Sequence, residues 1–220
     1  MLKVVVFDGG YGGELFADEL EKELPVIKVI RVIDWRNASN FLKNSRLARQ
    51  TAMEALRPYI GRVDLIIFAN YFLSITSLRY FQRRFKNQAF LGLKPPSLDT
   101  FKERPTLALT TKALARTISY YNYRTRLRRR IDTLCLDGWS NLVDDGELTY
   151  NMIYQEFEEF RRAYHYLPQE VILICSQFND IKDELREILG NVRIYDGFSE
   201  TVKDACKLLK IRGGTGKKKK

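Results

Sequence analysis

The chain has 220 residues, of which 45% are hydrophobic, and a formal net charge of +10. This is enough for one substantial core or two small domains. No signal peptide is expected before the first strand, and no stretch approaches the roughly 20 apolar residues of a membrane span. The cysteines, Cys135, Cys175 and Cys206, are odd in number without paired spacing, so no disulfide framework is expected. Together these features predict a cytoplasmic protein with no membrane partner.

The chain opens with a buried strand, a glycine-rich loop and an amphipathic helix. Val4–Phe7 are apolar and mostly β-branched, and four glycines follow between positions 9 and 13. This order is typical of an open α/β sheet, in which ligands bind beyond the carboxyl ends of the strands. Asp8 lies at that end, so it is a candidate site residue as well as a candidate cap of the loop or helix. Gly9 and Gly10 allow a ligand close to the backbone and leave amides for an anion.

Strands and helices then alternate along the chain. Strands are expected at 26–33, 63–68, 89–93, 131–136 and 192–195, and a strand followed by a polar loop is expected at 105–111 and at 170–176. Helices are expected at 41–57, 71–85, 147–166 and 199–209, the last with Ser199 as its N-cap. Two more are expected, one that begins at about residue 113 and one that follows residue 176 and ends at residue 189. Because helices separate almost all the strands, we expect parallel sheets.

The pattern repeats after the candidate linker Lys94–Ser97. The strand beginning at Val4 corresponds to one beginning at Thr106, 102 residues later, and Ala69 corresponds to Cys175, 106 residues later. The two offsets predict two similar α/β halves that face each other across a cleft, a usual place for a small ligand. The expected division is 1–94 for the first lobe, 95–194 for the second, 195–210 for a helix packing back on the first lobe, and 211–220 for a disordered basic tail.

Two basic clusters contribute to the positive charge. One is the run Lys217–Lys220, and the other is a set of arginines close to several tyrosines: Arg124, Arg126, Arg128, Arg129 and Arg130. Basic residues interleaved with aromatics can bind nucleic acid. More often such a run is a solvated helix face, so we do not expect specific nucleic-acid binding. Weak attraction to polyanions or acidic partners stays open.

Five segments, in this order and spacing, resemble the cofactor-independent aspartate/glutamate racemase superfamily, and most of all glutamate racemase. They are Phe7–Gly13, Leu109–Ala113, Asn141–Gly146, Ile174–Phe178 and Ile194–Gly197. The resemblance implies an α/β fold of two pseudo-symmetric lobes with flavodoxin-like parallel sheets facing a central cleft, and no cofactor. It also implies a small amino acid or carboxylate as ligand, with the supply of D-glutamate for bacterial cell walls as biological context. A homodimer is left open.

The chemistry implied by the resemblance needs one cysteine on each side of the substrate. One thiolate removes the Cα proton, and the other thiol delivers a proton to the opposite face. The resemblance places Cys175 and Asp8 in the catalytic role. Backbone amides and small side chains at loop ends would hold the substrate, and the corresponding positions here are Gly9, Gly10, Ala69, Asn70, Tyr71, Thr111, Ser176 and Gln177.

Several positions depart from the family pattern, and Ser176 and Leu114, each in the place of a threonine, are two of them. Ala69 replaces the first cysteine, Gly9 a serine, Tyr71 a threonine, and Gln177 the histidine that would assist the second thiol. An alanine methyl group cannot move a proton, and a general acid–base group commonly contributes about 10²–10⁴-fold in rate. We therefore expect two-thiol racemization to be lost.

Three functions stay open on the sequence. The first is a binding or regulatory homologue without racemase activity. The second is a one-cysteine enzyme similar to arylmalonate decarboxylase, in which Cys175 protonates a carbanion. The third is a racemase in which Asp8 or Tyr71 replaces the missing thiol.

Other candidate residues are expected to be structural. Free cysteine is often a small buried hydrophobe, and we expect Cys135 and Cys206 to lie in the core. Trp35 is expected to contribute to packing. No cluster of His, Cys and Asp has ligand spacing, so no metal site is expected.

Overall fold

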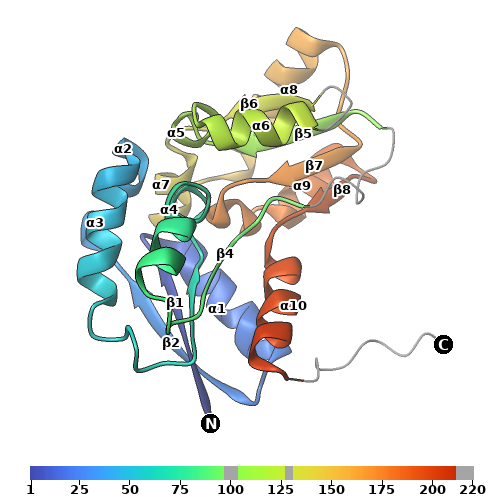
Figure 1. The fold of residues 1–220 in the computed structure, drawn as a ribbon. Coiled ribbons are helices and arrows are strands. Elements are labelled where there is room, and N and C mark those ends of the chain that lie inside the picture. The colour runs from blue at the N-terminus through green and yellow to red at the C-terminus, as the bar shows by residue number, and fades with distance from the viewer. Residues whose placement is uncertain (97–103, 127–130, 212–220) are drawn as a thin grey trace, which may run out of the picture. The chain divides into compact units, whose positions relative to one another are not determined.

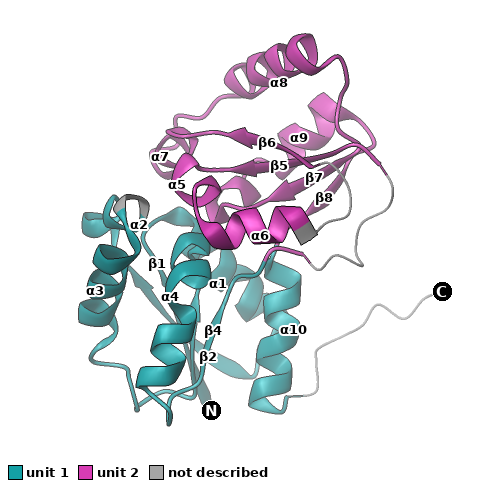
Figure 2. Ribbon diagram, turned by 45° about the horizontal axis from the view of Figure 1, so that its top comes forward, with its two compact units in different colours: residues 1–94, 197–220 teal, residues 95–196 magenta. Residues whose placement is uncertain are grey.

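The computed structural model describes residues 1–96, 104–126 and 131–211, and the chain divides into two compact units (Figure 2). Unit 1 consists of residues 1–94 together with the segment from Gly197 onward, and unit 2 consists of residues 95–196. Arg128–Arg130 of the second basic cluster and the run Lys217–Lys220 lie outside the described residues. Within the described ranges, no helix is long and apolar enough to cross a membrane.

Unit 1 is built on a four-stranded parallel sheet in the order β2-β1-β3-β4. Its strands are β1 (Leu2–Asp8), β2 (Ile27–Ile33), β3 (Leu65–Phe68) and β4 (Phe90–Gly92) (Figure 1). Its helices are α1 (Tyr11–Glu23), the 3-10 helix η1 (Trp35–Asn37), α2 (Asn40–Lys43), α3 (Ser45–Leu56), α4 (Tyr71–Arg84) and α10 (Phe198–Leu209). The single helix expected over 41–57 is divided at Asn44, because the Asn44 side chain caps α3 by accepting from the amide of Leu47 at 2.8 Å.

The core of unit 1 is aromatic. All four residues of β3 are buried, as expected for a parallel strand covered by helices on both faces. Phe68 contacts the rings of Phe7, Phe81 and Phe90, with centroids 5.0–6.3 Å apart. Such aromatic pairs add to the stabilisation that comes from burial alone.

Helix α10 packs against α1, and the Phe198 ring lies 5.0 Å from the Phe16 ring. The N-cap of α10 is Gly197, not Ser199, which lies inside the helix, so the predicted cap was wrong. The reason is steric. A Cβ atom on Gly197 would lie 2.4 Å from Tyr71 Oη and 2.5 Å from the Lys94 carbonyl oxygen, so only glycine fits where α10 begins.

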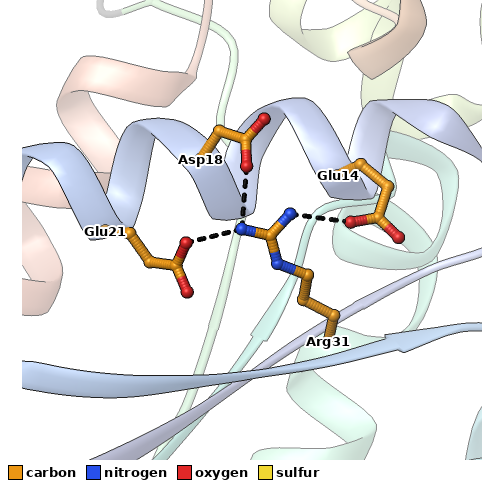
Figure 3. A network of polar contacts seen from close by, with 4 residues as sticks. All are labelled: Glu14, Asp18, Glu21 and Arg31. Carbon is orange, nitrogen blue, oxygen red and sulfur yellow. Dashed lines mark hydrogen bonds and ion pairs between the residues drawn. The ribbon is translucent and has the colours of Figure 1, made fainter.

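An ion-pair network connects β2 to α1. The guanidinium of Arg31 contacts three carboxylates spaced along one side of α1, Glu14 at 2.9 Å, Asp18 at 2.7 Å and Glu21 at 2.5 Å (Figure 3). Hydrogen bonding to Glu14, and then to the other two acids, raises the pKa of Arg31 above its usual value despite partial burial. One guanidinium therefore compensates the acids on this side of α1.

Unit 2 contains a second four-stranded parallel sheet, in the order β6-β5-β7-β8. Its strands are β5 (Thr106–Thr110), β6 (Ile131–Cys135), β7 (Glu170–Leu173) and β8 (Arg193–Tyr195). Its helices are α5 (Lys112–Ala115), α6 (Ile118–Arg126), α7 (Trp139–Asp144), α8 (Tyr150–Tyr164), the 3-10 helix η3 (Ser176–Asn179) and α9 (Lys182–Leu189).

The two sheets have the same strand order, which confirms the predicted α/β class with parallel sheets. Three predictions about single residues were wrong. Trp35 is 47% exposed, because it lies in the short η1 segment outside the sheet. Cys135 and Cys206 are half-buried rather than in the core, since one ends strand β6 and the other lies near the end of α10. Burial nevertheless raises the pKa of both thiols.

Candidate functional site

Asp8 ends β1 at the carboxyl edge of the unit 1 sheet and is fully buried. Its Oδ1 atom accepts from the Gly9 amide at 2.6 Å and from Asn70 Nδ2 at 3.0 Å. The Gly9 amide, expected to be available to an anion, is therefore used by Asp8. Two donors on one oxygen hold the carboxylate in a fixed orientation.

Asn70 connects Asp8 to the start of α4. While its amide nitrogen donates to Asp8, its Oδ1 accepts from the Leu73 amide at 2.9 Å and caps the helix. Helix α1 also begins at this edge, with Gly10 as its extended N-cap. The N-termini of two long helices thus start beside the sheet, and such ends favour carboxylates and other anions.

Gly9 has no room for a larger side chain. A Cβ atom at this position would lie 2.5 Å from Cδ2 of Phe41 and 3.2 Å from Cα of Ala38. Phe41 is almost fully buried and makes an edge-to-face contact with Phe7 at 5.7 Å. The ring of Phe41 therefore occupies the space in which a serine side chain would project from position 9.

Ala69 and Tyr71 flank Asn70, and both are buried. The Ala69 amide donates to the carbonyl of Phe7 at 2.8 Å, so the residue continues the pairing of β3 with β1 beyond the strand end. The hydroxyl of Tyr71 approaches Gly197, at the start of α10. Tyr71 thus connects the start of α4 with the point where the chain returns to unit 1.

Cys175 lies at the carboxyl edge of the unit 2 sheet, two residues after the end of β7, and is 8% exposed. Its thiol donates to Oε1 of Gln177 at 3.2 Å. The hydroxyl of Ser176 donates to the same oxygen, also at 3.2 Å. The Gln177 amide therefore accepts from both neighbours.

Asp144, at the end of α7, determines which atom of the Gln177 amide faces the thiol. Gln177 Nε2 donates to Asp144 Oδ2 across 3.5 Å. A carboxylate accepts and does not donate, so the amide nitrogen turns toward Asp144 and the amide oxygen toward Cys175. An acceptor facing the S–H group favours the neutral thiol over the thiolate.

Thr111 lies at the end of the neighbouring strand β5 and is buried. Its hydroxyl accepts from the Leu114 amide at 3.4 Å and caps α5. The preceding Thr110 donates to the carbonyl of Ile174 at 3.3 Å, which ties β5 to the strand end that carries Cys175.

The predicted site residues thus form two groups. Asp8, Gly9 and Asn70 are joined by hydrogen bonds in unit 1, and Cys175, Ser176 and Gln177 are joined in unit 2. Sequence reasoning did not select Asp144 or Phe41. Asp144 lies in the segment Asn141–Gly146, which carried part of the resemblance, so a signal for it existed. Nothing in the sequence marks Phe41.

Comparisons with known proteins find distant relatives among the glutamate racemases. No family model matches the chain. It is 19% identical over 216 residues to the glutamate racemase of Aquifex aeolicus, covering 96% of this chain and 85% of the relative. It is 25% identical over 221 residues to the glutamate racemase of Campylobacter curvus, covering 91% and 80%.

Solved structures have the same fold. The glutamate racemase of Escherichia coli, in complex with L-glutamate and the activator UDP-MurNAc-ala, has a TM-score of 0.81 at 19% identity, covering 96% of this chain and 84% of that one. The allantoin racemase of Pseudomonas fluorescens has a TM-score of 0.64 at 16% identity, covering 100% and 99%.

Proposed function

Because the chain is a distant homologue of the glutamate racemases, in the aspartate/glutamate racemase superfamily, we propose that it binds a small amino acid or carboxylate but does not perform two-thiol racemization. Two relatives bind glutamate in their solved structures, the Escherichia coli enzyme L-glutamate and the Francisella tularensis enzyme D-glutamate. A cytoplasmic location and a homodimer stay predictions.

The observation that carries the proposal is the difference between Ala69 and Cys175. They follow equivalent strands, β3 and β7, each the third strand in a sheet of the same order. Racemization needs a proton acceptor on one face of the Cα atom and a donor on the other. Ala69 offers no titratable group, so only unit 2 retains a thiol at this position.

The residues around Ala69 support binding rather than proton transfer. The N-termini of α1 and α4 suit a ligand carboxylate. Asp8 is a hydrogen-bonded carboxylate that suits an ammonium or hydroxyl group. Phe41 in the place of a serine side chain makes this part of the proposed site more apolar than a glutamate site with a hydroxyl there.

A second candidate function rests on the Cys175 thiol, which donates to an amide oxygen. A neutral thiol is the form that delivers a proton. In a decarboxylation, the bond between Cα and a carboxylate breaks and CO₂ leaves. The electron pair stays on Cα, which takes the thiol proton, and the resulting thiolate is reprotonated by water. One thiol is enough for this reaction.

The test follows the Cα proton. The protein is incubated in D₂O with each enantiomer of glutamate and aspartate, and the Cα–H signal is followed by NMR beside a Cys175→Ala variant. We expect ligand resonances to broaden on binding, with no inversion of either amino acid. Inversion of either enantiomer that disappears in Cys175→Ala would overturn the loss of racemization.

Two further outcomes separate the candidates. CO₂ release from an arylmalonate, abolished by Cys175→Ala and retained by Cys206→Ala on α10, would favour the one-thiol enzyme over a protein that only binds. The absence of saturable binding for all four amino acids and for the arylmalonate would overturn the carboxylate-binding proposal.

A further inference from the structure

The charged side chains of α1 are paired to a greater extent than those of α3 and α4. On α1, Arg31 compensates Glu14, Asp18 and Glu21 (Figure 3). Helices α3 and α4, which pack against each other, carry five arginines and one acid, Glu54. The Glu54 carboxylate accepts from Gln50 at 3.2 Å. The arginines of α3 and α4 therefore have no acidic compensation comparable to that on α1.

Four of these arginines form what we call the α3–α4 arginine face: Arg46, Arg49, Arg79 and Arg83. Arg46, Arg79 and Arg83 are exposed. Arg46 and Arg49 are three residues apart on α3, and Arg79 and Arg83 are four apart on α4, so each pair lies on one side of its helix. The Arg49 guanidinium of α3 stacks on the ring of Tyr80, which lies between Arg79 and Arg83 in the sequence of α4, at 4.3 Å.

This face lacks anionic partners. Across residues 1–96, 104–126 and 131–211, none of its four arginines forms an ion pair. The buried Nε atom of Arg49 has no hydrogen-bond partner within these ranges. The three exposed arginines, Arg46, Arg79 and Arg83, therefore give this surface an uncompensated positive charge, which suits a polyanion.

We propose that the α3–α4 arginine face binds the phosphate backbone of a nucleic acid, without preference for base sequence. Guanidinium groups bind phosphate bidentately, and all four cations are arginine rather than lysine. Arginines four residues apart on α4 are about 6 Å apart along the helix axis. This spacing suits a nucleic-acid backbone, which carries one phosphate charge on every nucleotide. Phosphate contacts position a protein but carry no base information. The net charge of +10 adds long-range attraction.

The test measures the binding of fluorescently labelled single-stranded DNA oligonucleotides of two unrelated sequences, by anisotropy between about 50 and 200 mM salt. The variant is Arg79→Gln/Arg83→Gln in the full chain. The control, Arg161→Gln/Arg162→Gln on exposed α8 of unit 2, removes the same charge, and with it the ion pair between Arg161 and Glu158 at 2.6 Å. A second variant, Arg79→Lys/Arg83→Lys, keeps the charge.

We expect both sequences to bind equally and the α4 variant to lose roughly tenfold in affinity. Its plot of log affinity against log salt should be shallower by about 1.4, or about 0.7 for each lost phosphate contact. The control should lose less than about twofold, and the lysine variant should keep most of the slope. Thermal unfolding verifies that each variant is folded.

Three outcomes would overturn the proposal. Equal losses in the α4 variant and the α8 control would show that net charge, and not this face, attracts the oligonucleotide. Displacement of the oligonucleotide by polyglutamate at equal charge concentration would assign the face to acidic proteins. No binding at the lowest salt would exclude the nucleic acid.

Discussion

Units 1 and 2 contain sheets of the same order but end their corresponding strands differently. Gly9 follows β1 in unit 1, where the Phe41 ring excludes any Cβ atom. The corresponding residue of unit 2, after β5, is Thr111, whose hydroxyl caps α5. Ala69 follows β3, whereas Cys175 follows β7 and donates to Gln177. At these two positions, the carboxyl edge is thus closely packed in unit 1 and carries hydrogen-bonding side chains in unit 2.

This difference shows that the fold and the chemistry vary independently within one chain. Parallel pairing requires only that the strands be apolar and covered by helices. It does not determine which side chain projects where a strand ends, so unit 1 can carry Ala69 and unit 2 Cys175 with the same strand order.

The largest effect is expected for Gly9→Ser, which adds to unit 1 the kind of side chain that unit 2 has at Thr111. The new Cβ atom would meet Phe41 Cδ2 at 2.5 Å, and overpacking of this kind typically costs about 1–3 kcal/mol. Urea unfolding, followed by circular dichroism, measures the loss of stability.

A double-mutant cycle identifies the cause. In a Phe41→Leu background, the narrower leucine side chain should move aside for the serine. The decrease in the free energy of unfolding caused by Gly9→Ser should then fall by about half or more. An equal cost in both backgrounds would show that Phe41 does not exclude the serine, and the packed description of unit 1 would be wrong.

The sequence predicted this comparison only in part. Periodicity identified the strands, and the offset between Ala69 and Cys175 predicted the repeat. It did not predict that Phe41 lies over Gly9, because 32 residues separate them and the contact depends on how α2 packs. Nor did it place Asp144 beside Gln177, since that contact depends on the position of α7, a helix that the hydrophobic pattern did not indicate.

The division of helices also followed local contacts that periodicity does not encode. Asn44 and Thr111 end one apolar pattern and cap the next helix through their own side chains. Gly197 begins α10 because Tyr71 and the Lys94 backbone leave no space for a Cβ atom. The last of these is a contact between distant segments, which a single sequence does not reveal.

A smaller effect is expected for Gln177→His. This variant tests whether the side chain at position 177 controls the Cys175 thiol at the carboxyl edge of unit 2. The amide of Gln177 accepts from the thiol and favours its neutral form, whereas a protonated histidine would favour the thiolate. Alkylation of Cys175 by iodoacetamide should therefore begin at a lower pH in Gln177→His than in the original chain. The pH dependence of iodoacetamide alkylation measures this shift, in a Cys135→Ser/Cys206→Ser background.

Asp144→Asn is the matched control for that variant. Combined with Gln177→His, it removes the carboxylate that would support the imidazolium, so part of the decrease should be reversed. If Gln177→His leaves the midpoint of alkylation where it is in the original chain, residue 177 does not control the thiol.

The smallest effect is expected for an ion pair between the two chain segments of unit 1. Unit 1 is made of two segments of the chain, whereas unit 2 is made of one. Lys94, just before unit 2, pairs with Asp204 of α10 at 2.6 Å. Burial raises the pKa of Asp204, but hydrogen bonding and attraction to Lys94, with smaller contributions from Lys207, outweigh it, and the pKa lies below the usual value of 3.8. A lowered pKa means that the pair stabilises the fold above about pH 4 and that this contribution is lost as Asp204 is protonated on acidification.

Because both side chains are partly exposed, Lys94→Met should cost only about 0.5 kcal/mol at pH 7. The gap between the variant and the original chain should close below about pH 4, as the carboxylate becomes neutral in both. Urea unfolding at several pH values measures this gap. The matched control is Lys203→Met, because Lys203 is an exposed lysine of α10 that forms no ion pair among the described residues. A gap that stays constant down to about pH 3 would mean that Lys94 acts through its methylene chain, and that the ion pair does not hold the two segments of unit 1 together.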